Sequence, residues 1–132
     1  MAQLWITVAV LVCWAAVTQA GRLLGGREPV DVSSSGVKQA LSFAMYEYNR
    51  GSNDMYASRP VTVRKAERQV VSGYKYFLDV DVGRTQCRKP TTDMDVCDLH
   101  TDPAYAKVST CHFVVYYVPW TSQQQLQKSE CD

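Results

Sequence analysis

Apolar residues follow a helical period in one segment of the chain. Between Ser33 and Gly51 they recur three and four positions apart, which places them on a single face of a helix. Ser33 to Ser35 supply hydroxyls that can cap the start of this helix, and Asn49 with Gly51 marks its end. The pattern predicts one amphipathic helix, whose apolar stripe consists of Val37, Ala40, Leu41, Ala44, Met45 and Tyr48.

Alternation of apolar and polar residues predicts strands in much of the remaining chain. The clearest strand runs from Tyr74 to Val82, where every second residue is apolar and the residues between them are mostly charged. Thr85 to Tyr105 is predicted to be irregular. A long helix must bury its stripe on something, so the pattern indicates an α+β fold with the helix laid across an antiparallel sheet. The other expected strands are Pro29–Val32, Val61–Val70 with a change of phase near Ala66, Val108–Val118, and a last one around Leu126 that ends at Cys131.

Three groups of apolar residues lie where polar residues are usual, at chain reversals and near the start of the domain. Exposed hydrophobic side chains at such places are typical of a surface that a partner buries. The alternative is that the valines and the tryptophan are ordinary core residues. The groups are Leu23-Leu24-Gly25-Gly26, Gln69-Val70-Val71-Ser72-Gly73 and Pro119-Trp120.

The amino-terminal residues have the composition of a secretory signal peptide. Leu4 to Val17 is an apolar run broken only by Thr7, and it is short for a membrane span. Small residues at Thr18 and Ala20 predict cleavage before Gly21. No Lys or Arg precedes the run, and an uncleaved membrane anchor is the alternative. We therefore expect a signal peptide at residues 1–20, a single domain at 21–132 and an extracellular location.

Cleavage would leave an even number of cysteines. Cys87, Cys97, Cys111 and Cys131 all lie in the second half of the chain. In an oxidising compartment, four cysteines indicate two disulfides, for which three connectivities are open. Sequential pairing closes the shortest loops.

Charge and motifs argue against several classes of function. The net charge of +1 gives no electrostatic basis for binding nucleic acid or an anionic membrane. No catalytic Ser/His/Asp set, phosphate loop or zinc spacing is present, so we expect neither an enzyme nor a cofactor. The acidic segment that begins at Asp93 does not predict a calcium loop, because its sixth and twelfth positions are Asp98 and Ala104 rather than Gly and Glu. No metal site is expected.

Taken in order, these elements resemble the cystatins. Gln69 to Gly73 is similar to the family's Q-x-V-x-G signature, Pro119-Trp120 to its second hairpin pair, and Gly25 to its amino-terminal glycine. The segment from Ala40 to Asp54 resembles the family helix. The cysteines resemble those of the secreted, two-disulfide branch, of the egg-white cystatin and cystatin C type. The resemblance covers essentially all of residues 21–132.

The resemblance implies a five-stranded antiparallel sheet wrapped around one long helix, with disulfides Cys87–Cys97 and Cys111–Cys131. It implies a tight, reversible, non-covalent inhibitor of papain-like cysteine proteases such as cathepsins. Leu23, Leu24 and Gly25 would then fill the unprimed side of the protease cleft. The residues Gln69, Val70, Val71, Ser72 and Gly73 would cover the catalytic region, and Pro119 with Trp120 the primed side.

Three further expectations accompany this interpretation. Ser52, Asn53 and Asp54 form an ordinary turn or, as in some relatives, a loop that inhibits legumain, which cuts after Asn. We expect mainly a monomer, and strain at the first hairpin offers a route to a domain-swapped dimer. The alternative function is a secreted binding or host-defence module on the same scaffold that inhibits no protease.

Overall fold

The segment with the helical period folds as α2 (Ser35–Gly51) in the computed structural model, which describes residues 26–91 and 96–132. Ser34 is the N-cap, and its hydroxyl oxygen accepts a hydrogen bond of 3.4 Å from the Val37 N–H. At the other end, the buried Asn49 amide donates to the Ser58 carbonyl at 3.0 Å and accepts from the Ser58 N–H at 2.8 Å. These bonds fix the end of the helix to the first long strand.

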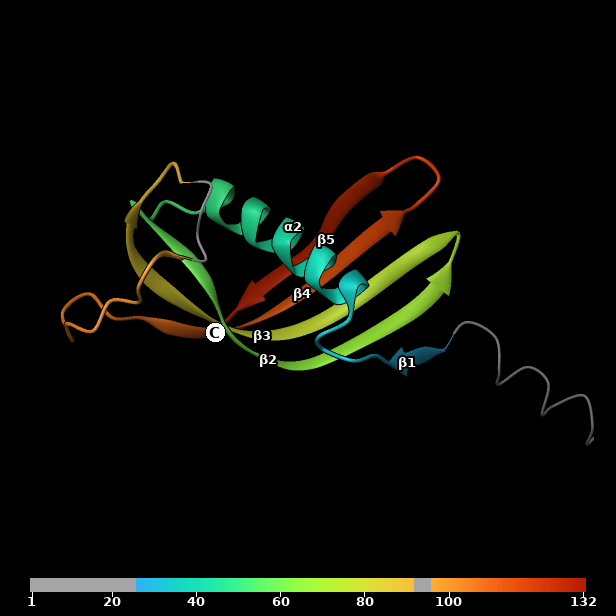
Figure 1. Cartoon of the computed structure of the whole chain (residues 1–132), viewed down its shortest axis with the longest axis horizontal. Coiled ribbons are helices and arrows are strands. Elements are labelled where there is room, and N and C mark those ends of the chain that lie inside the picture. The colour runs from blue at the N-terminus through green and yellow to red at the C-terminus, as the bar shows by residue number, and fades with distance from the viewer. Residues whose placement is uncertain (1–25, 92–95) are drawn as a thin grey trace, which may run out of the picture.

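Five antiparallel strands form a single sheet in sequence order, β1-β2-β3-β4-β5. Figure 1 shows α2 lying across one face of this curved sheet, so the expected α+β architecture is confirmed. The strands are β1 (Arg27–Pro29), β2 (Tyr56–Val71), β3 (Gly73–Arg88), β4 (Val108–Val118) and β5 (Gln123–Cys131).

The core lies between the apolar stripe of the helix and the inner face of the sheet. Burying a side chain of this kind stabilises the fold by about 1.5–3 kcal/mol relative to leaving it exposed. Leu41 and Tyr48 pack at the edge of the core and are partly buried. The buried cluster contains Val37, Ala40, Ala44, Met45, Ala66, Tyr76, Leu78, Val80, Val82, Cys111, Phe113 and Val115. The alternation predicted for Tyr74 to Val82 therefore corresponds to the buried face of β3, on which Tyr76, Leu78, Val80 and Val82 lie.

Three strand boundaries predicted from the pattern are wrong. β1 begins and ends earlier than Pro29–Val32, because the Asp31 carboxylate accepts bonds from the Ser33 N–H and hydroxyl and turns the chain toward the helix. β2 begins at Tyr56 rather than Val61. β3 continues past Thr85 to Arg88, since the buried Thr85 hydroxyl donates to the Ala57 carbonyl at 2.6 Å and is satisfied inside the sheet.

The phase change in β2 falls slightly before the predicted position. The register with β3 shifts between Pro60 and Thr62 and again between Val63 and Lys65, just ahead of Ala66. Such shifts move neighbouring side chains to opposite faces. As a result Val61 is 43% exposed, whereas Ala66 is in the core.

Two disulfides join neighbouring segments of the second half. Cys87 bonds to Cys97, and Cys111 on β4 bonds to Cys131 on β5. This is the sequential pairing that the resemblance implies. The predicted signal peptide lies outside the described residues, and in the described ranges no helix is both long and apolar enough to cross a membrane.

Candidate functional site

The reversal between β2 and β3 exposes two valines. Val71 pairs with Gly73 across the turn, which leaves Ser72 at its tip. Val70 is 58% exposed and Val71 is 40% exposed, so neither is a core residue. Hydrophobic side chains thus project from the end of a long, hydrogen-bonded ladder.

Neighbouring strand β4 braces this first hairpin. The Tyr116 hydroxyl donates a hydrogen bond to the carbonyl of Ser72. Gly73 has a φ of +110°, and a Cβ at this position would lie 2.6 Å from the Tyr117 carbonyl oxygen. Glycine is therefore required both by the backbone conformation and by the close approach of β4. The tip is therefore held against β4 rather than extending freely.

The second reversal, from Pro119 to Ser122, exposes a tryptophan. The Thr121 N–H donates to the Val118 carbonyl at 3.3 Å and the Ser122 N–H to the Pro119 carbonyl at 3.4 Å. Ser122 adopts a positive φ of 56°, which completes the turn. Trp120 is 70% exposed and so is not a core aromatic.

Both tips and the start of β1 lie at the same end of the sheet (Figure 1). The first tip adjoins the second, because a Cβ at Gly73 would lie 3.3 Å from a methyl carbon of Val118, the residue before Pro119. On the other side, Arg27 of β1 pairs with Gln69 of β2. Leu23, Leu24 and Gly25 lie outside the described residues, and the described chain begins at Gly26 beside this end.

The hairpin end presents exposed apolar side chains. All four cysteines of the second half are disulfide-bonded. The His112 ring on β4 pairs with the Asp79 carboxylate at 2.6 Å, on the outer face of the sheet. Within residues 26–91 and 96–132, no group of three or more potential metal ligands is found. The exposed valines and tryptophan at the hairpin end are typical of a surface that a partner buries.

Ser52, Asn53 and Asp54 lie far from the hairpin tips, after the carboxyl end of α2 (Figure 1). Asn53 is exposed, whereas its neighbours are partly buried and hydrogen-bonded. The Ser52 hydroxyl oxygen accepts from the Asp54 N–H at 3.1 Å, and the Lys89 ammonium donates to the Ser52 carbonyl at 2.8 Å. The loop is thus fixed on both sides of Asn53.

An ion pair strengthens this loop. The Arg84 guanidinium lies 2.7 Å from the Asp54 carboxylate, which also accepts a 3.0 Å bond from the Tyr56 N–H. Partial burial raises the pKa of Asp54, but these bonds and the nearby positive charges outweigh burial and leave the pKa below its usual value. The loop borders a pocket of about 770 Å³, whose lining also includes Arg84 and Lys107.

Comparison with known proteins decides the family. The model of the cystatin domain matches residues 25–120, more than half of the chain. This chain belongs to the cystatin family. It is 53% identical to chicken (Gallus gallus) cystatin over 83% of this chain and 79% of the relative. It is 43% identical to mouse (Mus musculus) cystatin-C over 97% of this chain and 92% of the relative.

Solved structures support the same assignment. Dimeric human cystatin F has a TM-score of 0.77 and 29% identity, with 83% of this chain and 87% of that one covered. The Al-CPI structure has a TM-score of 0.70 and 26% identity, and the match covers 82% of this chain and 98% of that one. The resemblance to secreted two-disulfide cystatins is thereby confirmed. Cystatins are cysteine protease inhibitors and not enzymes, so the expectation that this cystatin is no enzyme is also confirmed.

Sequence reasoning missed the residues that support the loops. Tyr116 belongs to a run of apolar and aromatic residues in β4, and nothing in that run indicates that its hydroxyl reaches Ser72. Lys89 lies in the stretch predicted to be irregular and Arg84 lies directly before it, yet they hold Ser52 and Asp54, respectively. Neither contact follows from the local pattern, because the partners lie 37 and 30 positions apart in the sequence.

Proposed function

We propose that this cystatin inhibits papain-like cysteine proteases by filling the active-site cleft with its hairpin end. The observation that carries the proposal is that Val70, Val71 and Trp120 are exposed and belong to two hairpin tips at the same end of the sheet (Figure 1). A papain-like cleft is a groove with apolar pockets around a reactive thiolate, and rigid apolar projections match such a groove at low ordering cost.

In the proposed complex, Gln69 to Gly73 covers the catalytic region and Pro119 with Trp120 covers the primed side. The amino-terminal segment with Leu23, Leu24 and Gly25 occupies the unprimed side. Trp120 is a large rigid side chain of the type that often dominates binding energy, and Pro119 restricts its backbone. No bond to the protease sulfur is formed, so inhibition is reversible.

Titration of papain tests the proposal directly. Nanomolar amounts of the secreted protein should remove papain activity in proportion to the amount added, and activity should return on dilution. Activity that stays undiminished at a molar excess of inhibitor would exclude protease inhibition. It would favour a binding or host-defence module on the same scaffold.

A second inhibitory site for legumain is proposed at Ser52, Asn53 and Asp54. It is supported by the exposure of Asn53 between two hydrogen-bonded neighbours, since a fixed loop presents its Asn to an enzyme without first being ordered. Replacing Asn53 with Lys should abolish legumain inhibition and leave papain inhibition unchanged. Unaltered legumain inhibition in this variant would remove the second site.

We also propose that the inhibitor acts outside the cell, after removal of residues 1–20. The extracellular location agrees with the two disulfides, which persist in oxidising compartments. Mass spectrometry of the secreted protein should give a chain that starts at Gly21. A chain that retains Met1 and stays in the membrane would contradict both points.

A further inference from the structure

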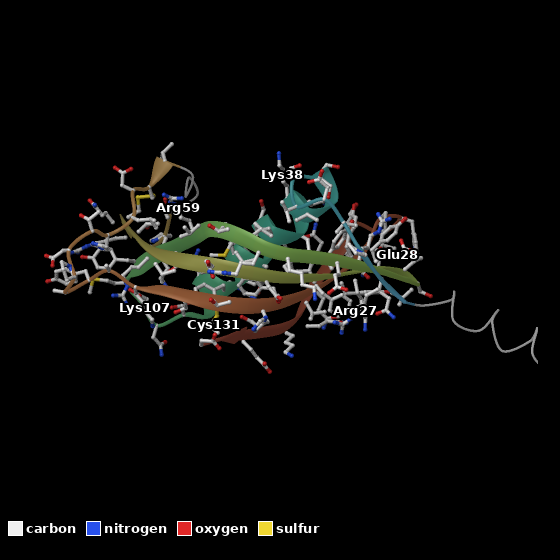
Figure 2. All side chains as sticks on the ribbon, turned by 90° about the horizontal axis from the view of Figure 1, so that it is seen from below. Arg27, Glu28, Lys38, Arg59, Lys107 and Cys131 are labelled. Atoms are coloured by element: carbon white, nitrogen blue, oxygen red, sulfur yellow. A yellow bond between two sulfur atoms is a disulfide. The ribbon has the colours of Figure 1, made fainter. Side chains whose placement is uncertain are left out.

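Arg27 is the first described residue whose side chain contacts the rest of the domain. Its guanidinium carbon lies 3.6 Å from the centre of the Phe77 ring. Gly26 precedes it, and a Cβ built at Gly26 would meet no atom within 4 Å. The packing of the described chain on the sheet therefore begins at Arg27. Figure 2 shows Arg27 at the end of the sheet where β1 enters, far from Lys107 near the other end.

β1 is a short strand at the edge of the sheet. The strand has three residues, all exposed, and it pairs with β2 alone. Phe77 belongs to β3, so the Arg27 side chain reaches across β2 to a second strand. The register is consistent with this contact. Pro29 and Phe77 both pair with Glu67, so their side chains lie on one face of the sheet. Arg27 is two residues before Pro29 and therefore lies on the same face.

The contact has the geometry of a cation–π interaction, for which the charge lies within about 6 Å of the ring centre. None of the ion pairs among the described residues includes Arg27. Its charge is thus directed at the ring rather than at a carboxylate. Short exposed strands fray easily, and an added contact near the free end opposes fraying.

The register of β1 also determines where the preceding segment begins. Arg27 pairs with Gln69, which is followed directly by the exposed Val70 and Val71. If β1 frayed or slipped, the segment before it would no longer start beside the first hairpin. Holding β1 in register reduces the ordering cost of binding that segment.

We propose that Arg27, packed on Phe77, is a positioning residue that holds β1 in register and thereby directs the amino-terminal segment into the protease cleft. This inference rests on the proposed function. It differs from a direct role for Arg27, in which its charge would contact the enzyme and Phe77 would be irrelevant to binding.

A double-mutant cycle on the full secreted chain separates the two roles. The variants are Arg27→Ala, Phe77→Leu and the double variant, and the dissociation rate from papain is measured for each. Arg64→Ala is the matched control, because Arg64 is an exposed outer-face arginine that pairs with Asp81 instead of a ring.

Each single substitution should raise the dissociation rate about two- to fivefold, as expected for loss of one exposed cation–π contact. The double variant should be no faster than the faster single variant, because both remove the same contact. The Arg64→Ala control should dissociate like wild type. An unchanged rate for Phe77→Leu, or effects that multiply in the double variant, would overturn the proposal.

Hydrogen exchange in the free protein gives a readout that does not depend on inhibition. The Val30 N–H donates to the Ala66 carbonyl at 3.1 Å, directly after β1. Its exchange should accelerate in Arg27→Ala, while amides of the central strand β3 exchange as in wild type. Unchanged Val30 exchange would overturn the positioning role. If the wild-type chain failed to inhibit papain, the proposed function would fail, and the exchange result would still show whether Arg27 holds β1.

Discussion

Gly73 determines the shape of the first hairpin at the scale of a single residue. Its φ of +110° lies in the region that side chains disfavour, and the Tyr117 carbonyl occupies the space where a Cβ would be. The sequence alone predicts the positive φ, because Gly73 follows a chain reversal. It does not reveal the lack of space for a Cβ, which exists only because β4 lies beside the tip.

We predict that Gly73→Ala lowers the free energy of unfolding by about 2 kcal/mol, through the strained φ and the close carbonyl. Chemical denaturation measures the change. Gly51→Ala is the matched control, since a Cβ there meets nothing within 4 Å in a helical residue. It should leave stability unchanged or raise it by up to about 1 kcal/mol. Equal stabilities for the two variants would contradict the account.

The pKa of His112 on β4 depends on a contact with the neighbouring strand β3. The hydrogen bond to Asp79 and the charge of that carboxylate raise the pKa of His112; Asp132 adds to this effect, and desolvation and Lys128 oppose it. The stabilising contribution is therefore complete below the ordinary pKa of about 6.5. It is lost as pH rises through the higher folded-state pKa.

NMR titration of the His112 ring should give a midpoint above about 6.5 in the wild type. In Asp79→Asn the midpoint should fall toward the ordinary value, and the loss of stability with rising pH in that range should diminish. A wild-type midpoint at or below the ordinary value would show that the Asp79 contact does not persist in solution.

At the scale of elements, each hairpin combines a supporting ladder with an exposed tip. In the second hairpin, bonds to the Val118 and Pro119 carbonyls close the turn, and Trp120 projects from it. In the proposed complex the tip contacts the protease, whereas the hydrogen-bonded ladder stabilises the fold. Substitution at the tip should therefore separate the two properties.

We predict that Trp120→Ala weakens papain binding by about 2 kcal/mol, the loss expected for a hot-spot aromatic. The free energy of unfolding should change by less than about 0.5 kcal/mol, because exposed side chains contribute little to it. Tyr46→Ala, which removes a 60% exposed aromatic from the helix, is a control that should bind normally. A Trp120→Ala protein that is unstable but binds normally would place Trp120 in the core instead.

Much of the element order could be predicted because local pattern determines it. The stripe of α2 and the alternation of β3 each reflect one buried face, which period alone reveals. The start of β2 could not be predicted in this way, because Arg59 and Pro60 resemble a loop and the register shifts interrupt the alternation. The positions of both hairpin tips also follow from the sequence, whereas the Tyr116–Ser72 bond depends on strands distant in the chain.

At the scale of the whole molecule, strand order places the two candidate sites at opposite ends. Each long hairpin reverses at the same end as β1, and the helix carries the chain toward Ser52 at the other (Figure 1). The proposed papain and legumain sites therefore share no residues.

We predict that the inhibitory form is the monomer. A domain-swapped dimer formed by opening the first hairpin would straighten Val70 to Gly73 and remove the tip. After mild heating, any dimer separated by size-exclusion chromatography should have lost papain inhibition, while the monomer fraction retains it. A swapped dimer with full activity toward papain would contradict the role assigned to this tip.

The central claim is that the hairpin end fills the protease cleft by shape, without reacting with the thiolate. A crystal structure of the complex with papain whose catalytic thiol has been alkylated tests it most directly. We predict a complex in which Val70 to Gly73 and Trp120 lie in the cleft and no covalent bond joins the proteins. Loss of binding on alkylation, or papain bound at the Ser52 to Asp54 end, would contradict the claim.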